Sequence, residues 1–99
     1  MERVNHYVRH EKYRDRMEIV GQILNTVAEG NGGNGHINKT KIMYMAMLSY
    51  AQLKEYLSLL AESGLLDYDS KEDGTYKITE KGMNFLKVYN GIGEYVSLE

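Results

Sequence analysis

The spacing of apolar residues changes in one short segment of this chain, and that change limits the fold more than any other feature. On both sides of residues 65–79, apolar residues recur every three or four positions, which is typical of amphipathic helices. Within the segment, LLDYD and TYKIT are short β-prone runs joined by SKEDG, whose Asp-Gly pair favours a tight turn. The pattern predicts a mainly α chain with a small β-hairpin, an α+β fold.

Two helices are expected before residue 47. The first covers residues 15–30, where Asp15 caps the free backbone N–H groups of the first turn and Gly30 takes the left-handed position after the last turn. The glycine-rich connection GNGGNG follows it. Asn38 or Thr40 then caps a short second helix through KIMYMAM. Its residues available to the core are Ile42, Met43 and Met45 or Ala46.

Two more helices are expected on either side of the hairpin. Ser49 caps the third helix and Gly64 ends it, and Thr79 caps the last one, EKGMNFLKVYNGIGEYV. One stripe of the third helix falls within about 80° around the helix axis and is predicted to be buried: Tyr50, Leu53, Leu57 and Leu60. Five tyrosine rings are expected to pack on the core with their hydroxyl groups at the surface: Tyr44, Tyr50, Tyr56, Tyr68 and Tyr76.

The connection between the second and third helices is very short. Only Met47 and Leu48 separate KIMYMA from the Ser49 cap, so the two helices cross steeply and the outer face of the longer one projects. Helix, short helix, tight turn, longer helix, hairpin, helix is the order of a winged helix-turn-helix with an additional C-terminal helix, the hairpin being the wing. We therefore expect a basic N-terminal arm (1–14), a winged helix-turn-helix domain (15–79) and a C-terminal dimerisation helix (80–97).

Composition excludes several classes of function. The chain has 99 residues, the length of one domain, and its lack of Cys excludes disulfides, thiolate nucleophiles and Cys-ligated zinc. No Ser has a base nearby in the sequence, so we expect no enzyme, no cofactor and no small-molecule substrate. No run approaches the roughly 20 apolar residues of a membrane span, and the charged start lacks a signal-peptide apolar region. These observations predict a cytoplasmic protein without membrane contact.

Two motifs that resemble binding sites are interpreted as ordinary surface. Gly30, Gly32 and Gly35 match the dinucleotide fingerprint GxGxxG, but they follow a helix rather than a strand, which indicates a plain loop. His6 and His10 have the spacing of two metal ligands on a helix. Because the sequence offers no third ligand nearby beyond two glutamates, exposed histidines are favoured and no metal is expected.

Charge is distributed unevenly along the chain. Residues 1–47 carry seven Lys or Arg and five Asp or Glu, a balance of +2, whereas residues 48–99 carry five and nine, a balance of −4. The net charge of −2 gives no general argument for nucleic-acid binding, so the position of the basic residues must decide. Six of them are candidates for phosphate contact, in the arm and just after it, at the start of the second helix and in the hairpin: Arg14, Arg16, Lys39, Lys41, Lys71 and Lys77.

The third helix carries candidates for DNA contact at its start and on its outer face. Gln52 is suited to a bidentate pair with adenine, and Lys54 to guanine or a phosphate. Three hydroxyl groups are suited to hydrogen bonds with phosphates or bases, those of Ser49, Tyr50 and Ser58.

Two carboxylates on the same face leave a second interpretation open. Glu55 is suited to accept a hydrogen bond from cytosine N4, but Glu62 is repelled by phosphate unless it points away. Such a face is also typical of a solvated helix. The alternative function is therefore a winged-helix protein–protein interaction module whose acidic face binds a basic partner.

Three segments carry a resemblance to a known family. KTKIMYMAMLSY (39–50), LLAESGLL (59–66) and ITEKGMNFL (78–86) resemble, in order and spacing, the archaeal winged-helix regulators related to the small dimeric chromatin-associated DNA-binding proteins of archaea. The resemblance covers about residues 14–96. It implies DNA binding through the helix at residues 49–63 and through the wing, and dimerisation through an antiparallel coiled coil of C-terminal helices.

The last helix carries a candidate seam for that coiled coil. Phe85, Tyr89, Ile92 and Val96 are spaced 4, 3 and 4 residues apart, the pattern of a coiled-coil stripe. We therefore expect a homodimer that presents two third helices to successive major grooves of double-stranded DNA. Its expected role is that of a transcriptional regulator or a nucleoid-associated protein.

Overall fold

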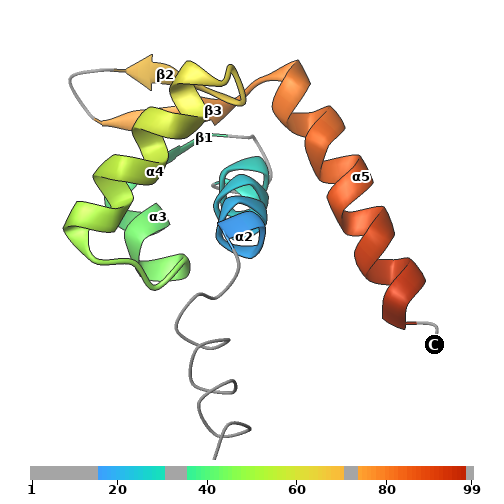
Figure 1. Ribbon diagram of the computed structural model, residues 1–99. Coiled ribbons are helices and arrows are strands. Elements are labelled where there is room, and N and C mark those ends of the chain that lie inside the picture. The colour runs from blue at the N-terminus through green and yellow to red at the C-terminus, as the bar shows by residue number, and fades with distance from the viewer. Residues whose placement is uncertain (1–15, 31–35, 71–73, 98–99) are drawn as a thin grey trace, which may run out of the picture.

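The computed structural model describes residues 16–30, 36–70 and 74–97 (Figure 1). The expected Asp15 cap and residues 31–35 of the connection lie outside this part of the chain. The helices and strands follow the order that the sequence predicts, with one strand added: α2 (Arg16–Glu29), β1 (His36–Asn38), α3 (Lys39–Met45), α4 (Tyr50–Glu62), β2 (Leu66–Ser70), β3 (Thr75–Ile78) and α5 (Glu80–Ser97). The mainly helical α+β fold is confirmed.

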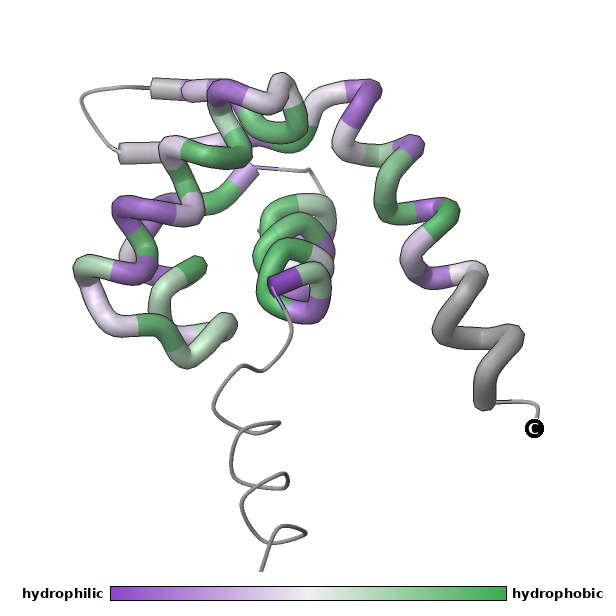
Figure 2. Tube along the Cα trace, in the orientation of Figure 1, coloured by the Kyte–Doolittle hydropathy of each residue, from purple (hydrophilic) through white to green (hydrophobic). Residues whose placement is uncertain are grey.

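Helix α2 is the centre of the core. Figure 1 shows it between α3 and α4 on one side and α5 on the other, with the sheet at one end. Its residues Ile23, Leu24 and Val27 are fully buried, as their helical spacing predicts. Leu53 and Leu60 of α4 are also almost fully buried. In Figure 2 the hydrophobic positions gather on α2 and on the sides of its neighbours that face it.

The hairpin belongs to a three-stranded antiparallel sheet with the strand order β1-β3-β2. Strands β2 and β3 are the predicted hairpin, whereas β1 was not predicted from the sequence. Ile37 of β1 pairs with Tyr76 of β3, and Tyr76 pairs with Tyr68 of β2. A strand of three residues is too short to show an alternating pattern, and β1 exists because β3 offers it a hydrogen-bonding edge.

The predicted positions of the tyrosines are correct only in part. Tyr56 and Tyr76 are buried, whereas Tyr44, Tyr50 and Tyr68 are 73%, 57% and 45% exposed. Tyr50 was expected in the buried stripe of α4, but Tyr56 completes that stripe instead. Tyr50 is the first residue of the helix and borders a groove beside the hairpin, so its ring cannot reach α2. The sequence does not distinguish the tyrosines that are buried from those that are exposed, because their burial depends on packing between distant elements.

The chain reverses between α3 and α4 as predicted. Ala46 closes α3, and the amides of Met47 and Leu48 donate to the carbonyl oxygens of Tyr44 and Met43, at 3.2 and 3.0 Å. These two bonds form a Schellman motif, in which the residue after the cap adopts the left-handed conformation. That residue is Met47, with a φ of 56°. The two helices are separate, and the turn between them is set by backbone hydrogen bonds.

Both ends of α4 are capped. The Ser49 hydroxyl accepts a hydrogen bond from the Gln52 amide at 3.1 Å, and the Gln52 side-chain oxygen accepts one from the Ser49 amide at 3.0 Å. At the other end, Gly64 has a φ of 78° after the last turn, and Lys81 Nζ donates to the Ser63 carbonyl oxygen at 2.7 Å. These contacts fix where α4 begins and where the chain leaves it for β2.

Two further expected helix caps form, one at the start of α3 and one at the start of α5. The Asn38 side chain accepts a hydrogen bond from the Lys41 amide at 2.9 Å, so Asn38, and not Thr40, caps α3. The Thr79 hydroxyl accepts one from the Gly82 amide at 3.0 Å at the start of α5.

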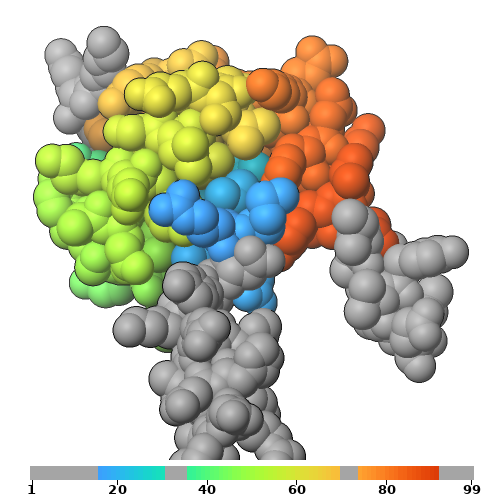
Figure 3. All heavy atoms as spheres, in the orientation of Figure 1, coloured from blue at the N-terminus to red at the C-terminus, as the bar shows by residue number. Residues whose placement is uncertain are grey.

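Helix α5 packs against α2. Tyr89 lies so close to Gly21 that any side chain at position 21 would overlap its ring. The amides of Asn25 and Asn90 exchange hydrogen bonds of 3.3 Å between the two helices. Figure 3 shows α5 at the edge of the molecule opposite to α4, so the two helices present separate surfaces.

We expect Met47→Gly to raise the free energy of unfolding by about 0.5–1 kcal/mol, because Gly adopts the left-handed conformation without a steric penalty. Met47 is 78% exposed, so little packing is lost. Urea unfolding measures the change. Met45→Gly is the matched control, since Met45 is also exposed but lies within α3, and it should cost about 1 kcal/mol. Equal effects of the two substitutions would contradict the left-handed turn.

Ser49→Ala is expected to lower the free energy of unfolding by about 1 kcal/mol, because the Gln52 amide loses its capping partner. The same unfolding experiment measures it. Ser58→Ala removes an exposed hydroxyl from the middle of the same helix and should change stability by no more than about 0.5 kcal/mol. If Ser49→Ala is equally neutral, the capping box does not stabilise α4.

Candidate functional site

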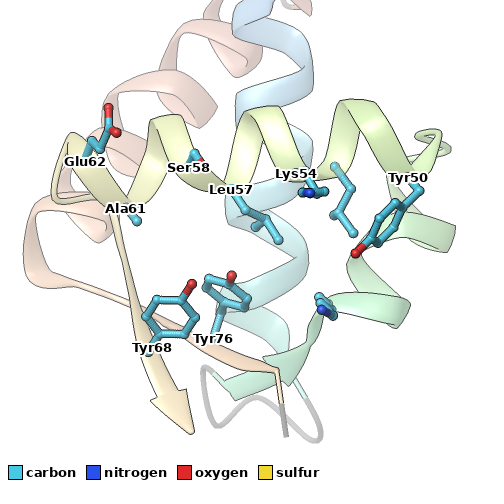
Figure 4. A pocket seen from close by; sticks show the side chains of 10 residues that line it. Tyr50, Lys54, Leu57, Ser58, Ala61, Glu62, Tyr68 and Tyr76 are labelled. Carbon is cyan, nitrogen blue, oxygen red and sulfur yellow. The ribbon is translucent and has the colours of Figure 1, made fainter. Parts of the chain in front are cut away.

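A groove runs between α4 and the hairpin (Figure 4). Its volume is about 330 Å³, and Leu53, Leu57 and Ala61 line it on the side of α4. Lys39 reaches it from the start of α3. The polar or charged side chains that line the groove are those of Lys39, Tyr50, Lys54, Ser58, Glu62, Tyr68 and Tyr76.

The hairpin side of the groove is a pair of tyrosines. Tyr68 and Tyr76 are cross-strand neighbours, and their ring centroids are 4.8 Å apart. Figure 4 shows both hydroxyl groups directed toward α4. Burial, and then a hydrogen bond with Tyr68, raise the pKa of Tyr76. Both effects favour the protonated form of the Tyr76 hydroxyl, which is a hydrogen-bond donor.

Two lysines give one end of the groove a positive charge. Lys54 Nζ lies 5.7 Å from the centre of the Tyr50 ring, a cation–π distance that keeps the ammonium group near the groove. The Lys39 amide donates to the Gly74 carbonyl oxygen at 2.9 Å, which ties the start of α3 to the start of β3. Glu62 lies at the other end of α4, so the charge along the groove changes from positive to negative.

Four of the predicted DNA-contact residues meet in this groove. Lys39, Tyr50, Lys54 and Ser58 line it together. Lys41 is exposed on α3 but does not line the groove. Arg14 and Lys71 lie outside the part of the chain that the structure describes.

Two predicted basic residues occupy other surfaces. Arg16 places its guanidinium 5.7 Å from the centre of the Tyr56 ring, on the other side of α4. Lys77 follows Tyr76 in β3, and successive strand residues point to opposite faces, so Lys77 lies on the open face of the sheet. Its cross-strand neighbours there are His36 and Asp67. The open face also holds a hydrogen bond between side chains, with His36 Nδ1 2.6 Å from Asp69 Oδ2.

The capping box changes what Gln52 and Ser49 can offer to a ligand. The side-chain oxygen of Gln52 is used by the Ser49 amide, so its NH₂ group remains as a donor. The expected bidentate pair with adenine needs both groups and would require the cap to open. Ser49 keeps its hydroxyl proton for a further acceptor, because its oxygen already accepts from the Gln52 amide.

The outer face of α4 is acidic rather than basic. Ala51, Glu55, Ser58 and Glu62 are spaced 4, 3 and 4 residues apart, and all four lie within about 60° around the helix axis. Glu55 and Glu62 are the charged members of this stripe, and both are exposed. The positive charge of α4, Lys54, lies to one side of the stripe, at the groove.

Sequence reasoning missed the two tyrosines as site residues. It assigned Tyr68 and Tyr76 to the core, which is correct for the buried Tyr76 but not for the exposed Tyr68. Both rings line the groove. The signal was present in the predicted hairpin, because a turn centred on SKEDG pairs these two residues on one face. The alternation of side chains along the two strands does not show which face of the sheet lies beside α4.

The proposed seam residues of α5 are partly engaged within the chain. Phe85 and Tyr89 are partly buried against the core, with their ring centroids 6.1 Å apart. The side chains of Ile92 and Val96 lie outside the described part of α5. Val88 is 64% exposed and, four residues before Ile92, borders the proposed stripe.

Among residues 16–30, 36–70 and 74–97, no group of three or more His, Cys, Asp or Glu side chains is placed to hold a metal ion. In the same residues, no helix has the length and apolar character needed to cross a membrane.

Comparison with known proteins agrees with this architecture. An uncharacterized protein of Methanocaldococcus jannaschii is 35% identical over 69 residues, which are 70% of this chain and 29% of that protein. The chain thus spans less than a third of the length of this relative. The crystal structure of Sso10a-2, a DNA-binding protein from Sulfolobus solfataricus, matches with a TM-score of 0.64 and 26% identity over 84% of this chain and 85% of that one.

The match to a known protein family includes every described helix and strand except the last residue of α5. Residues 13–96 match the winged helix-turn-helix family, and they include the reversed turn at Met47, the projecting helix α4 and the hairpin. The chain therefore belongs to the winged helix-turn-helix family.

Proposed function

We propose that this protein binds double-stranded DNA, with α4 in the major groove and the groove beside the hairpin against the DNA backbone. The observation that carries the proposal is the meeting of Lys39 and Lys54 with tyrosine and serine hydroxyls in one cavity of about 330 Å³. Ammonium and hydroxyl groups are the usual partners of phosphate oxygens. The similarity to Sso10a-2, itself a DNA-binding protein, supports the same function.

The geometry of the turn supports the placement of α4. In helix-turn-helix proteins, the second helix lies in the major groove and its N-terminal residues meet the base edges. Here the left-handed turn at Met47 leaves the outer stripe of α4 exposed, from Ala51 to Glu62. The wing contributes through Tyr68 and Tyr76, while Lys77 lies on the other face of the sheet.

The role we propose in the cell is that of a transcriptional regulator or a nucleoid-associated protein, acting in the cytoplasm on chromosomal DNA and without catalysis. Local placement of charge makes this compatible with a net charge of −2, because backbone contact depends on the cations that face the phosphates. Lys39, Lys41 and Lys54 lie near the start of α3 and α4, whereas the carboxylates of Asp67 and Asp69 belong to β2.

A second candidate function rests on the acidic stripe. Glu55 and Glu62 are exposed on the outer stripe of α4, and two carboxylates placed in this way also suit contact with a basic protein. Under that alternative, duplex DNA does not bind at low salt and removal of Lys39 leaves the protein complex intact.

Lys39→Ala and Lys54→Ala are each expected to weaken duplex binding and to reduce its salt dependence. If about four phosphates are neutralised, the slope of log K against log salt concentration is about −3.6, and each substitution should reduce its magnitude by about 0.9. Fluorescence anisotropy with one duplex at several salt concentrations measures the slope. Lys87→Ala is the matched control, since Lys87 is exposed on α5 at the opposite edge of the molecule. If the binding constant of the unaltered protein for the duplex does not change with salt concentration, the proposed contact with phosphates is wrong.

We also propose a homodimer formed through the C-terminal helix, with Phe85, Tyr89, Ile92 and Val96 as its stripe. Ile92→Asp should produce monomers in sedimentation velocity, because the charge would be buried in the seam without a partner. Met83→Asp places the same charge on roughly the opposite side of α5, where Met83 is exposed, and should leave the dimer intact. Monomers from Met83→Asp alone would move the interface to the other face of the helix.

A further inference from the structure

We infer that Glu55 is a base-reading residue, and that it selects a C·G base pair at one fixed position in each half-site by accepting a hydrogen bond from cytosine N4. The inference rests on the proposed DNA binding and adds a specificity-determining residue to it. It also assigns a function to a carboxylate that would otherwise oppose binding.

The first argument is the direction of the Glu55 side chain. At 100° per residue, Glu55 is about 160° around the helix axis from both Leu53 and Leu57. Leu53 and Leu57 are buried against the core, so Glu55 projects almost directly away from it. It is the sixth residue of α4, in the half of the helix from which base contacts are made. A helix that enters the major groove therefore brings this carboxylate to the base edges.

The second argument is that Glu55 is not engaged within the protein. In the described residues, the Glu55 carboxylate forms no hydrogen bond and no ion pair. Lys54, its neighbour in sequence, is held over the Tyr50 ring at the groove. A carboxylate facing DNA without a donor is repelled by the phosphates and loses its hydration, so a base must supply the donor.

The third argument is the choice among bases. In the major groove only cytosine N4 and adenine N6 are donors, and adenine presents its N7 acceptor beside N6. That acceptor repels a carboxylate, which is why adenine is read by an amide and cytosine by an acid. Gln52, the amide closest to Glu55 on this helix, has its oxygen engaged by the Ser49 amide. Gln52 therefore offers only its NH₂ donor and cannot pair with adenine through both groups, whereas Glu55 is the acceptor on this face of α4, and cytosine is its partner.

The test is selection of bound sequences from a pool of duplexes with a random central segment, at low salt. The unaltered protein should enrich cytosine at one position of each half-site. Glu55→Ala should lose that preference and keep the preferences at other positions. Glu62→Ala, which removes a carboxylate two turns later on the same stripe, is the matched control and should enrich the same sequences as the unaltered protein.

Binding to single duplexes gives the size of the effect. Replacing the selected C·G pair by T·A should weaken binding of the unaltered protein by roughly 5- to 150-fold and should scarcely change binding of Glu55→Ala. Glu55→Gln keeps the length of the side chain and supplies a donor, so its preference should move from cytosine to adenine. Because Glu55 is exposed, these variants should fold, and circular dichroism verifies it.

The outcomes separate the inference from the proposed function. Duplex binding without sequence preference, or the same selected cytosine with Glu55→Ala, would overturn the role of Glu55 and leave DNA binding in place. Failure of the unaltered protein to bind any duplex would overturn the proposed function and this inference together. In that case, Glu55 and Glu62 belong to a surface for a basic protein.

Discussion

The left-handed turn at Met47 is the constraint on which the other surfaces depend. Two backbone hydrogen bonds close α3, and the reversed residue directs the chain into the Ser49 cap of α4. The direction of α4 then decides which of its residues face α2, which face the hairpin and which face solvent. A residue with a Cβ atom in this conformation is strained, so the surrounding bonds must hold it. Burial of Leu48 beside it adds to that hold.

The sequence predicted the fold well because local signals and packing agree in most elements. Capping residues at Asn38, Ser49 and Thr79 mark helix starts, and Gly64 marks a helix end. The strand β1 escaped prediction because its three residues carry no pattern of their own. Its backbone hydrogen bonds are made with β3, which is distant in the sequence. Residues 36–38 alone therefore carry no pattern that would predict a strand.

The candidate site was harder to predict than the fold. Lys39, Tyr50, Lys54 and Ser58 were expected to contact DNA, and the structure brings them to one groove, although it does not test that contact. Lys77 was grouped with them because it is basic, yet its position in β3 turns it to the other face. The engagement of the Gln52 oxygen depends on the geometry of one turn of helix. Charge can be read from a sequence, but the face that carries it depends on packing.

The close approach of Tyr89 to Gly21 has a consequence for any assembly built through α5. With no side chain at position 21, the Tyr89 ring of α5 lies directly against the backbone of α2, and this contact helps to set the tilt of α5 against α2. In the proposed dimer, that tilt sets the distance between the two copies of α4 and hence the number of base pairs between half-sites. In that proposed dimer, a bulkier residue at position 21 would push α5 away from α2 and change the distance between the two copies of α4. Packing at one glycine of α2 would thus affect the distance between the two half-sites of the proposed dimer.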